Sequence, residues 1–180
     1  MKKEISAFEL HFLIKEWNLE GAKISKIFQL KDKFSFQLYI PTKGKTYLNL
    51  LNKMLFFSDK KIKNPIHPQG FCIFLRKHIS NSRIEEVKQL SFERIIEFKT
   101  NKGNLLIELF GKGNIALCAA NYDILGSYRK SNMSRVFEKG TKYPLEKKNS
   151  PFKTLKDLKE PIGKSLATDY GLGGKYSNYI

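Results

Sequence analysis

Apolar and polar residues alternate along much of this chain, which predicts a protein built mainly from short β-strands. The clearest case is residues 34–40, where every second residue is apolar and lies on one face of the predicted strand. Turn signals separate such segments at intervals of about 8–12 residues. The other predicted strands cover residues 23–27, 47–57, 83–90, 92–100, 105–110, 115–120 and 124–128.

Helical patterns interrupt the strands at two points. Ser6 is followed three residues later by Glu9, a capping box that predicts the start of a helix, and Gly21 is its predicted end. Residues 71–79 form the second predicted helix, whose last turn carries cations that favour the helix dipole. Two further short helices are expected at residues 155–158 and 162–170.

This succession of elements predicts an α+β fold, in which an antiparallel β-sandwich-like domain carries flanking helices. The domain is expected to cover residues 1–144. Residues 145–153 are polar and punctuated by proline, so we interpret them as a linker. Residues 154–180 follow as a separate short piece with a glycine-rich end.

The charge balance indicates a polyanionic partner. The 180 residues include 33 Lys and Arg against 17 Asp and Glu, a net charge of +16. Such an excess favours nucleic acid or the ribosome as partner over an anionic membrane surface or a lysine-rich surface without function. Residues 21–80 hold 12 basic and two acidic residues. The five arginines are more informative than the 28 lysines, because only arginine offers planar, bidentate recognition.

Several classes of protein are disfavoured by what the sequence lacks. No apolar run approaches the roughly 20 residues of a membrane span, and no signal peptide is recognisable. Cys72 and Cys118 stand alone in apolar runs, as reduced core thiols of a cytoplasmic protein do. The histidines have no metal-ligand spacing, and phosphate-loop, dinucleotide and hydrolase motifs are missing. We therefore expect no metal, no cofactor and no enzymatic activity.

Four groups of residues, taken in their order and spacing, carry a resemblance to a known family. They resemble the N-terminal NFACT domain of ribosome-associated quality-control factors, often labelled fibronectin-binding-protein-A-like, and specifically its archaeal and eukaryotic branch. The match extends over most of residues 4–144. The segments that carry it are residues 6–10 with 21–28, 71–79 with 83–84, 92–98, and 106–115.

The resemblance implies a function as well as a fold. Such factors bind tRNA and the large ribosomal subunit with an obstructed nascent chain, and they support untemplated C-terminal tailing. Relatives also carry a coiled coil and further RNA-binding domains, which would act here in cis or in trans. Two alternatives remain open. The chain could be a general basic RNA-binding module. It could also be a relative of the formamidopyrimidine-DNA glycosylases, because the fold of the family resembles the N-terminal domain of those enzymes. The glycosylases need an N-terminal Pro-Glu and a four-cysteine zinc finger, whereas this chain begins Met-Lys-Lys-Glu and has two cysteines.

The resemblance also marks residues tied to tRNA handling. Glu9 matches an acidic residue of the first helix, although the capping box explains it equally well. Glu93 and Arg94 match an Asp-Arg pair, with glutamate in place of the usual aspartate, which puts tailing in question. A cross-strand ion pair is the structural alternative for these two residues.

The remaining candidates also have a structural alternative beside the functional one. Arg76 and Lys77 match a family Arg-Lys and would contact phosphate or cap the helix. Lys112 and Asn114 lie in a Gly-Lys-Gly-Asn turn, which a plain hairpin also explains. The end of the chain is similar to the start of a helix-hairpin-helix that binds phosphate, and a flexible terminus is the alternative. The hairpin residues are Gly171, Gly173, Gly174 and Lys175. The aromatic residues assigned to the core rather than to base stacking are Phe34, Phe36, Phe71 and Phe74.

Overall fold

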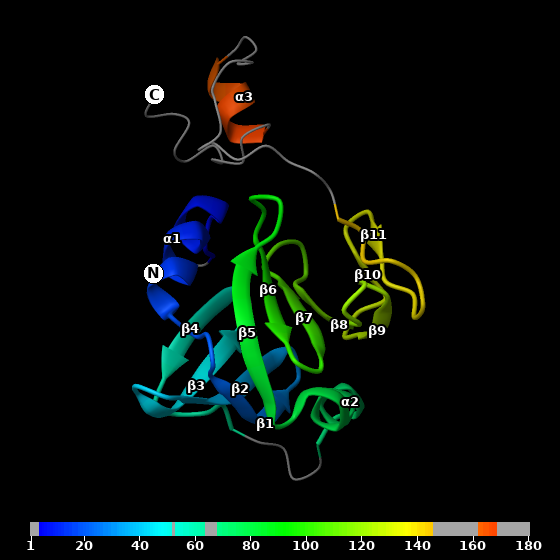
Figure 1. The fold of residues 1–180 in the computed structure, drawn as a ribbon. Helices are drawn as coiled ribbons and strands as arrows, with labels where there is room; N and C mark the ends of the chain where they lie inside the picture. The colour runs from blue at the N-terminus through cyan, green and yellow to red at the C-terminus, as the bar shows by residue number, and fades with distance from the viewer. Residues whose placement is uncertain (1–3, 52, 64–67, 146–161, 169–180) are drawn as a thin grey trace.

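The structure of the chain, a computed structural model, describes residues 4–51, 53–63, 68–145 and 162–168. Eleven strands and three helices are present in these ranges (Figure 1). The helices are α1 (Ala7–Trp17), α2 (Gly70–Ile79) and α3 (Ile162–Thr168). The strands are β1 (Lys23–Leu30), β2 (Lys33–Ile40), β3 (Gly44–Leu51), β4 (Met54–Ser58), β5 (Ser82–Gln89), β6 (Ile95–Thr100), β7 (Gly103–Glu108), β8 (Asn114–Cys118), β9 (Ile124–Ser127), β10 (Ser131–Asn132) and β11 (Arg135–Val136).

Nine strands form one antiparallel sheet in the order β4-β3-β2-β1-β5-β6-β7-β8-β9. The sheet has a narrow junction, because β1 pairs with β5 only through Lys23–Arg83 and Ile24–Ser82. This junction divides it into an N-terminal half-sheet, β1–β4, and a C-terminal half-sheet, β5–β9. The predicted antiparallel α+β character is confirmed. The predicted sandwich, however, is a single continuous sheet whose two halves share one core.

The main core receives apolar side chains from both half-sheets and from α1 and α2. In β2, the alternating residues of the sequence pattern all point into it, as predicted. Phe34 and Phe36 belong to this core, and Phe71 and Phe74 of α2 pack against it half-buried. Burial on this scale is the main source of stability in a domain of this size. Further members of the core include Leu10, Trp17, Ile27, Leu38, Leu48, Leu75, Ile79, Phe98, Leu105 and Ile107.

A second, smaller core lies on the opposite face of the C-terminal half-sheet. Leu106 of β7 and Cys118 of β8 contribute to it, together with Phe137 and Tyr143 from the chain that follows β9. This chain segment covers the sheet, so β6, β7 and β8 are buried on both faces. Both cysteines are buried free thiols, as predicted. Burial raises the pKa of Cys118 to about 12.

Three of the differences between predicted and observed element boundaries have a clear structural reason. Helix α1 begins with the predicted capping box, but it ends at Trp17, because Asn18 takes the left-handed conformation that ends a helix. The single strand predicted at 47–57 is wrong, since the chain reverses after Leu51 and forms the β3–β4 hairpin. Strand β6 begins only at Ile95, because residues 91–94 form a loop.

The C-terminal part of the chain is described only at α3. This helix confirms most of the one predicted at 162–170, whereas residues 155–158 and the hairpin glycines lie outside the described residues. No helix in the described ranges is long and apolar enough to cross a membrane.

Candidate nucleic-acid interface

The loop between β5 and β6 lies against the start of α1. Gln89 Nε2 donates hydrogen bonds to the Ala7 and Glu93 carbonyl oxygens, both at 2.8 Å. The His11 and Phe92 rings contact each other with centroids 5.7 Å apart. These contacts place the loop that carries Glu93 beside the first turns of the helix that carries Glu9, although the two glutamates are 84 positions apart.

The Glu9 carboxylate closes the N-terminus of α1. Glu9 Oε2 accepts hydrogen bonds from the Ser6 backbone N–H at 3.0 Å and from Ser6 Oγ at 2.9 Å. Ser6 Oγ in turn accepts from the Glu9 N–H at 3.1 Å. The structural interpretation of Glu9 is therefore confirmed as a reciprocal capping box, while its part in tRNA handling stays a prediction.

Arg94 extends from the loop toward the N-terminal segment of the chain. Its Nη1 lies 2.8 Å from Glu4 Oε2, and Lys53 Nζ approaches the same oxygen at 3.2 Å. The hydrogen bonds of Arg94 and Lys53 hold the pKa of Glu4 below its usual value. Because the Arg94 side chain is still 26% exposed, part of the guanidinium faces solvent.

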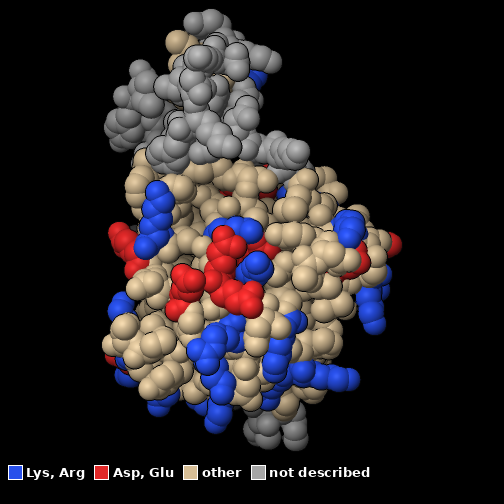
Figure 2. All heavy atoms as spheres, in the orientation of Figure 1, with Lys and Arg blue, Asp and Glu red and all other residues tan. Residues whose placement is uncertain are grey.

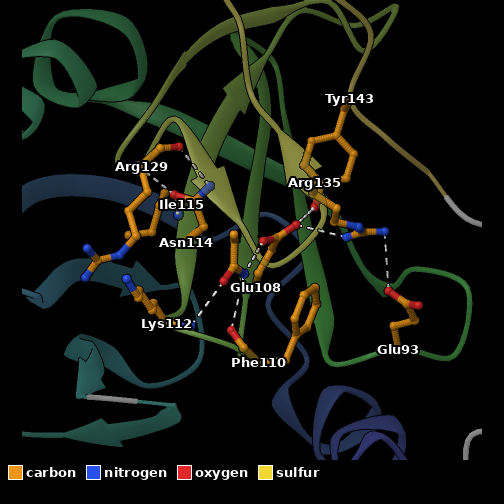
Figure 3. A network of polar contacts seen from close by, with 10 residues as sticks. Glu93, Glu108, Phe110, Lys112, Asn114, Ile115, Arg129, Arg135 and Tyr143 are labelled. Carbon is orange, nitrogen blue, oxygen red and sulfur yellow. Dashed lines mark hydrogen bonds and ion pairs between the residues drawn. The ribbon is translucent and has the colours of Figure 1, made fainter.

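The structural alternative for Glu93 and Arg94, a cross-strand ion pair, does not hold, because both lie in the loop before β6 and pair with residues outside the neighbouring strands or on β11. Glu93 Oε2 lies 3.4 Å from Arg135 Nη2, and Arg135 Nη1 lies 2.9 Å from Glu108 Oε1 (Figure 3). Glu108 is 1% exposed and also accepts hydrogen bonds of 2.7 Å from Asn132 Nδ2 and Tyr143 Oη. Burial and the Glu108 charge raise the pKa of Tyr143. The buried network thus fixes the position of the Glu93 carboxylate.

The same network reaches the Gly-Lys-Gly-Asn turn between β7 and β8 (Figure 3). Asn132 Oδ1 accepts from the Lys112 backbone N–H at 3.1 Å, and the Lys112 side chain is exposed. Asn114 is only 2% exposed. Its Nδ2 donates to the Arg129 carbonyl at 3.2 Å and its Oδ1 accepts from the Arg129 N–H at 2.8 Å. Asn114 therefore joins β8 to the bend after β9, and Lys112 is the residue of this turn that faces solvent.

Three cations gather around an open cavity beside this turn. Lys53, Lys112 and Arg129 line a space of about 300 Å³, together with a single carboxylate, that of Asp32. Asp32 pairs with Arg129 at 2.9 Å. Because Lys53 also contacts Glu4, the partner of Arg94, the cavity adjoins the loop that carries Arg94. The cavity has the charge and the polar donors that a phosphate group requires.

Arg76 and Lys77 lie apart from these residues, in the last turn of α2 (Figure 1). Arg76 Nε donates to the Ile27 carbonyl at 2.8 Å and so ties α2 to β1. Lys77 is exposed. Of the seven predicted tRNA-binding residues, the structure links Glu93, Arg94, Lys112 and Asn114 through ion pairs, hydrogen bonds and the cavity. Glu9 lies on α1, which packs against the β5–β6 loop, while Arg76 and Lys77 lie on another surface.

Sequence reasoning missed the residues that complete the site. Glu4, Lys53 and Arg129 carry no local motif, and each reaches the site only through contacts with residues far away in the sequence. Within the described ranges, no group of three or more His, Cys, Asp or Glu side chains is arranged to hold a metal ion.

Comparison with known proteins decides the family. The model of the family "NFACT N-terminal and middle domains" matches residues 7–180. The chain belongs to this family. Subunit 2 of the ribosome quality control complex from Saccharomyces cerevisiae is 30% identical over 136 residues, which is 72% of the chain and 13% of that protein. The archaeal Rqc2 homolog aRqcH from Methanocaldococcus jannaschii is 26% identical over 190 residues, 97% of the chain and 28% of the relative.

Solved structures confirm the fold of this NFACT chain. The N-terminal domain of fibronectin-binding protein PavA from Streptococcus pneumoniae superposes with a TM-score of 0.80 at 24% identity, covering 97% of the chain and 77% of that structure. The N-terminal part of the fibronectin/fibrinogen-binding protein from Streptococcus suis gives a TM-score of 0.78 at 23% identity. The chain spans less than a third of either curated relative described above.

Proposed function

We propose that this NFACT chain binds tRNA and the large ribosomal subunit carrying an obstructed nascent chain, as part of a factor that supports untemplated C-terminal tailing. One observation carries the proposal: Glu93 and Arg94, which the family resemblance ties to tRNA, share a loop that packs against α1, the helix of Glu9, and Arg94 is linked through Glu4 and Lys53 to a cavity lined by cations. Relatives that match most of the chain are named as ribosome quality control factors.

The chemistry of the site suits a folded RNA. Lys53, Lys112 and Arg129 supply charge for phosphates. The Arg94 guanidinium offers donors in a planar fork, which can bind a phosphate or a base edge in two places at once. The Glu93 side chain is only 9% exposed and pairs with Arg135, so we assign it the role of positioning the loop that carries Arg94.

The proposal gives the domain a binding role in the cytoplasm, with no catalytic step, no cofactor and no membrane partner. Tailing would require the coiled coil and the RNA-binding domains of the longer relatives, in cis or in trans. The longer side chain of Glu93 is compatible with tRNA binding because Arg135 holds its carboxylate in place.

An Arg94→Ala variant tests the site, with affinity for a deacylated tRNA mixture measured by fluorescence anisotropy. Since a hydrogen bond to a charged group contributes about 1.5–3 kcal/mol, tRNA affinity should fall roughly 10- to 100-fold. Glu4→Gln is the matched control: it breaks the same ion pair and keeps the guanidinium, so its affinity should stay equal or rise. Equal weakening by both variants would show that only the local structure matters and would contradict the proposal.

The nature of the ligand is tested separately by sequencing RNA bound to the chain in cell lysate. Enrichment of one or two tRNA species is expected, together with ribosomal RNA of the large subunit. Uniform recovery of bulk RNA would indicate the general basic module instead. Recovery of DNA alone, or base release from an oxidised-purine duplex, would favour the glycosylase relative.

A further inference from the structure

A solvent-exposed tyrosine lies between two lysines on the outer face of the N-terminal half-sheet. Tyr39 of β2 is 57% exposed. In the strand register Lys23 of β1 is its partner on one side and Lys45 of β3 its partner on the other. Cβ atoms of directly opposite residues are about 4.5–5.5 Å apart, so both ammonium groups are within reach of a ligand on the ring. Both lysines are exposed.

The next row of the same face repeats this mixture of aromatic and basic groups. Lys26 and Tyr47 lie on either side of Gln37 in the register. The Tyr47 ring contacts Phe28 with centroids 6.3 Å apart, and Lys61 Nζ lies 4.5 Å from the centre of the Phe28 ring. Phe28 is itself only 8% exposed, so the exposed Lys26 and the half-buried Tyr47 are the groups of this row that a ligand can reach.

Negative charge is missing from these three strands. Strands β1, β2 and β3 contain no Asp or Glu at any position. Figure 2 shows Lys and Arg gathered over the lower part of the molecule, where Figure 1 places β1–β4 and α2, and acidic side chains gathered higher. The field over this part of the molecule thus favours a polyanion.

We propose that this surface, the tyrosine–lysine face, binds a single-stranded segment of RNA. It is formed by Lys23, Lys26, Tyr39, Lys45 and Tyr47. An unpaired base stacks on Tyr39, while Lys23 and Lys45 contact the phosphates on either side of it. Stacking on an exposed aromatic ring requires a splayed base, so a loop, bulge or end binds here and a continuous duplex does not.

This inference rests on the proposed function only in that the partner is RNA. The tyrosine–lysine face is formed by β1–β3, whereas the site of Arg94 is formed by the β5–β6 loop, α1 and the β7–β8 turn. A structured RNA can occupy both, with its folded part at Arg94 and an unpaired segment on the tyrosine–lysine face.

The test measures binding of an unstructured oligouridine by fluorescence anisotropy at several salt concentrations. Tyr39→Ala should weaken binding about 5- to 100-fold, the range expected for one stacked base, and Tyr39→Phe should restore it. A Lys23→Gln, Lys45→Gln double variant should reduce the slope of log affinity against log salt by about 1.4, because two phosphate contacts are lost. The charge-matched control, Lys130→Gln with Lys139→Gln on exposed positions of the other half of the molecule, should leave that slope unchanged.

Each failure has a distinct meaning. Unchanged oligouridine affinity of Tyr39→Ala, or equal competition by polyglutamate of the same charge, would overturn the tyrosine–lysine face. Either result leaves the proposed function intact if Arg94→Ala still lowers the affinity for tRNA. If the wild-type chain binds tRNA but not oligouridine, the inference again falls alone. If it binds neither, both proposals fail.

Discussion

The two half-sheets differ in what covers their second face. In the N-terminal half, β1–β3 turn one face to the main core. On the other face Lys23, Tyr39 and Lys45 are exposed, while Phe28, Ser35 and Asn49 are buried. In the C-terminal half, the chain after β9 covers the second face of β6–β8, which is buried as well. The first half can therefore offer a strand face to a ligand, while the second can use only its loops and turns.

The covering of the second face also decides whether charged side chains in each half-sheet are buried with a partner or exposed to solvent. Glu97 and Glu108 are fully buried on the covered face and held by partners, Glu97 by Lys88 at 3.1 Å and Glu108 by Arg135 at 2.9 Å. Burial alone would lower the pKa of Lys88, but the hydrogen bond and charge of Glu97 outweigh it and raise that pKa. In the N-terminal half, by contrast, Lys23 and Lys45 are exposed to water, and the ion pair of Lys53 with Glu4 is also exposed.

The largest effect is expected from Arg135→Met, which leaves the Glu108 carboxylate buried without its cation. Losing one partner of a buried pair destabilises a protein by about 3–5 kcal/mol. Urea unfolding measures this free energy. The control is Lys142→Met, which removes an exposed partner of Asp123 and should change stability by less than about 1 kcal/mol. If Arg135→Met lowered the free energy of unfolding no more than Lys142→Met does, the buried network would not stabilise the C-terminal half-sheet.

Alanine substitutions at neighbouring positions compare the two faces directly. In β7, Leu105 and Leu106 lie in different cores, so both Leu→Ala changes should cost about 2–5 kcal/mol. In β2, Leu38→Ala should cost a similar amount, while Tyr39→Ala should stay within about 0.5 kcal/mol of wild type. Urea unfolding of the four variants gives the comparison. A large loss for Tyr39→Ala would mean that its ring packs against the protein instead of facing a ligand.

A smaller effect is expected at Gly111, in the turn that carries Lys112. Its φ is +57°, and a Cβ there would overlap the side-chain amide of Asn132. Gly111→Ala should therefore destabilise by roughly 1–3 kcal/mol. Gly44→Ala is the matched control, since it has a similar φ of +73° and open space around it. Backbone strain is present in both variants, whereas displacement of Asn132 occurs only in Gly111→Ala, so thermal unfolding should show a larger decrease in melting temperature for Gly111→Ala. Equal decreases in the two variants would contradict the displacement of Asn132.

A small effect is expected for Glu4→Gln, because this ion pair is exposed. At pH 7 the loss should be below about 1 kcal/mol. The folded pKa of Glu4 is lowered, so its contribution is complete above the unfolded pKa of about 4.3 and disappears as the pH falls through the folded value. Urea unfolding of both proteins over this range should show the curves converge in acid. A difference that persists or grows there would rule out the carboxylate charge as its origin.

The sequence by itself determined the local structure and the family of this protein. The capping box of Ser6, the alternation in residues 34–40 and the helix at 71–79 rest on short-range periodicity, which is physically independent of the rest of the chain. The same reasoning was wrong for residues 47–57, because a continuous apolar pattern does not reveal where a strand reverses. Net charge indicated a polyanion, and its concentration in residues 21–80 indicated the region, but not which side chains of that region remain exposed.

Only the tertiary structure decided which side chains meet. Lys53 contacts Glu4 across 49 positions and Arg94 contacts it across 90, so no spacing in the sequence could reveal this group. Asn114 and Lys112 belong to one motif, yet packing against the chain after β9 buries the first and leaves the second in water. Local pattern sets the conformation of a segment, whereas long-range packing sets which of its side chains remain exposed to solvent.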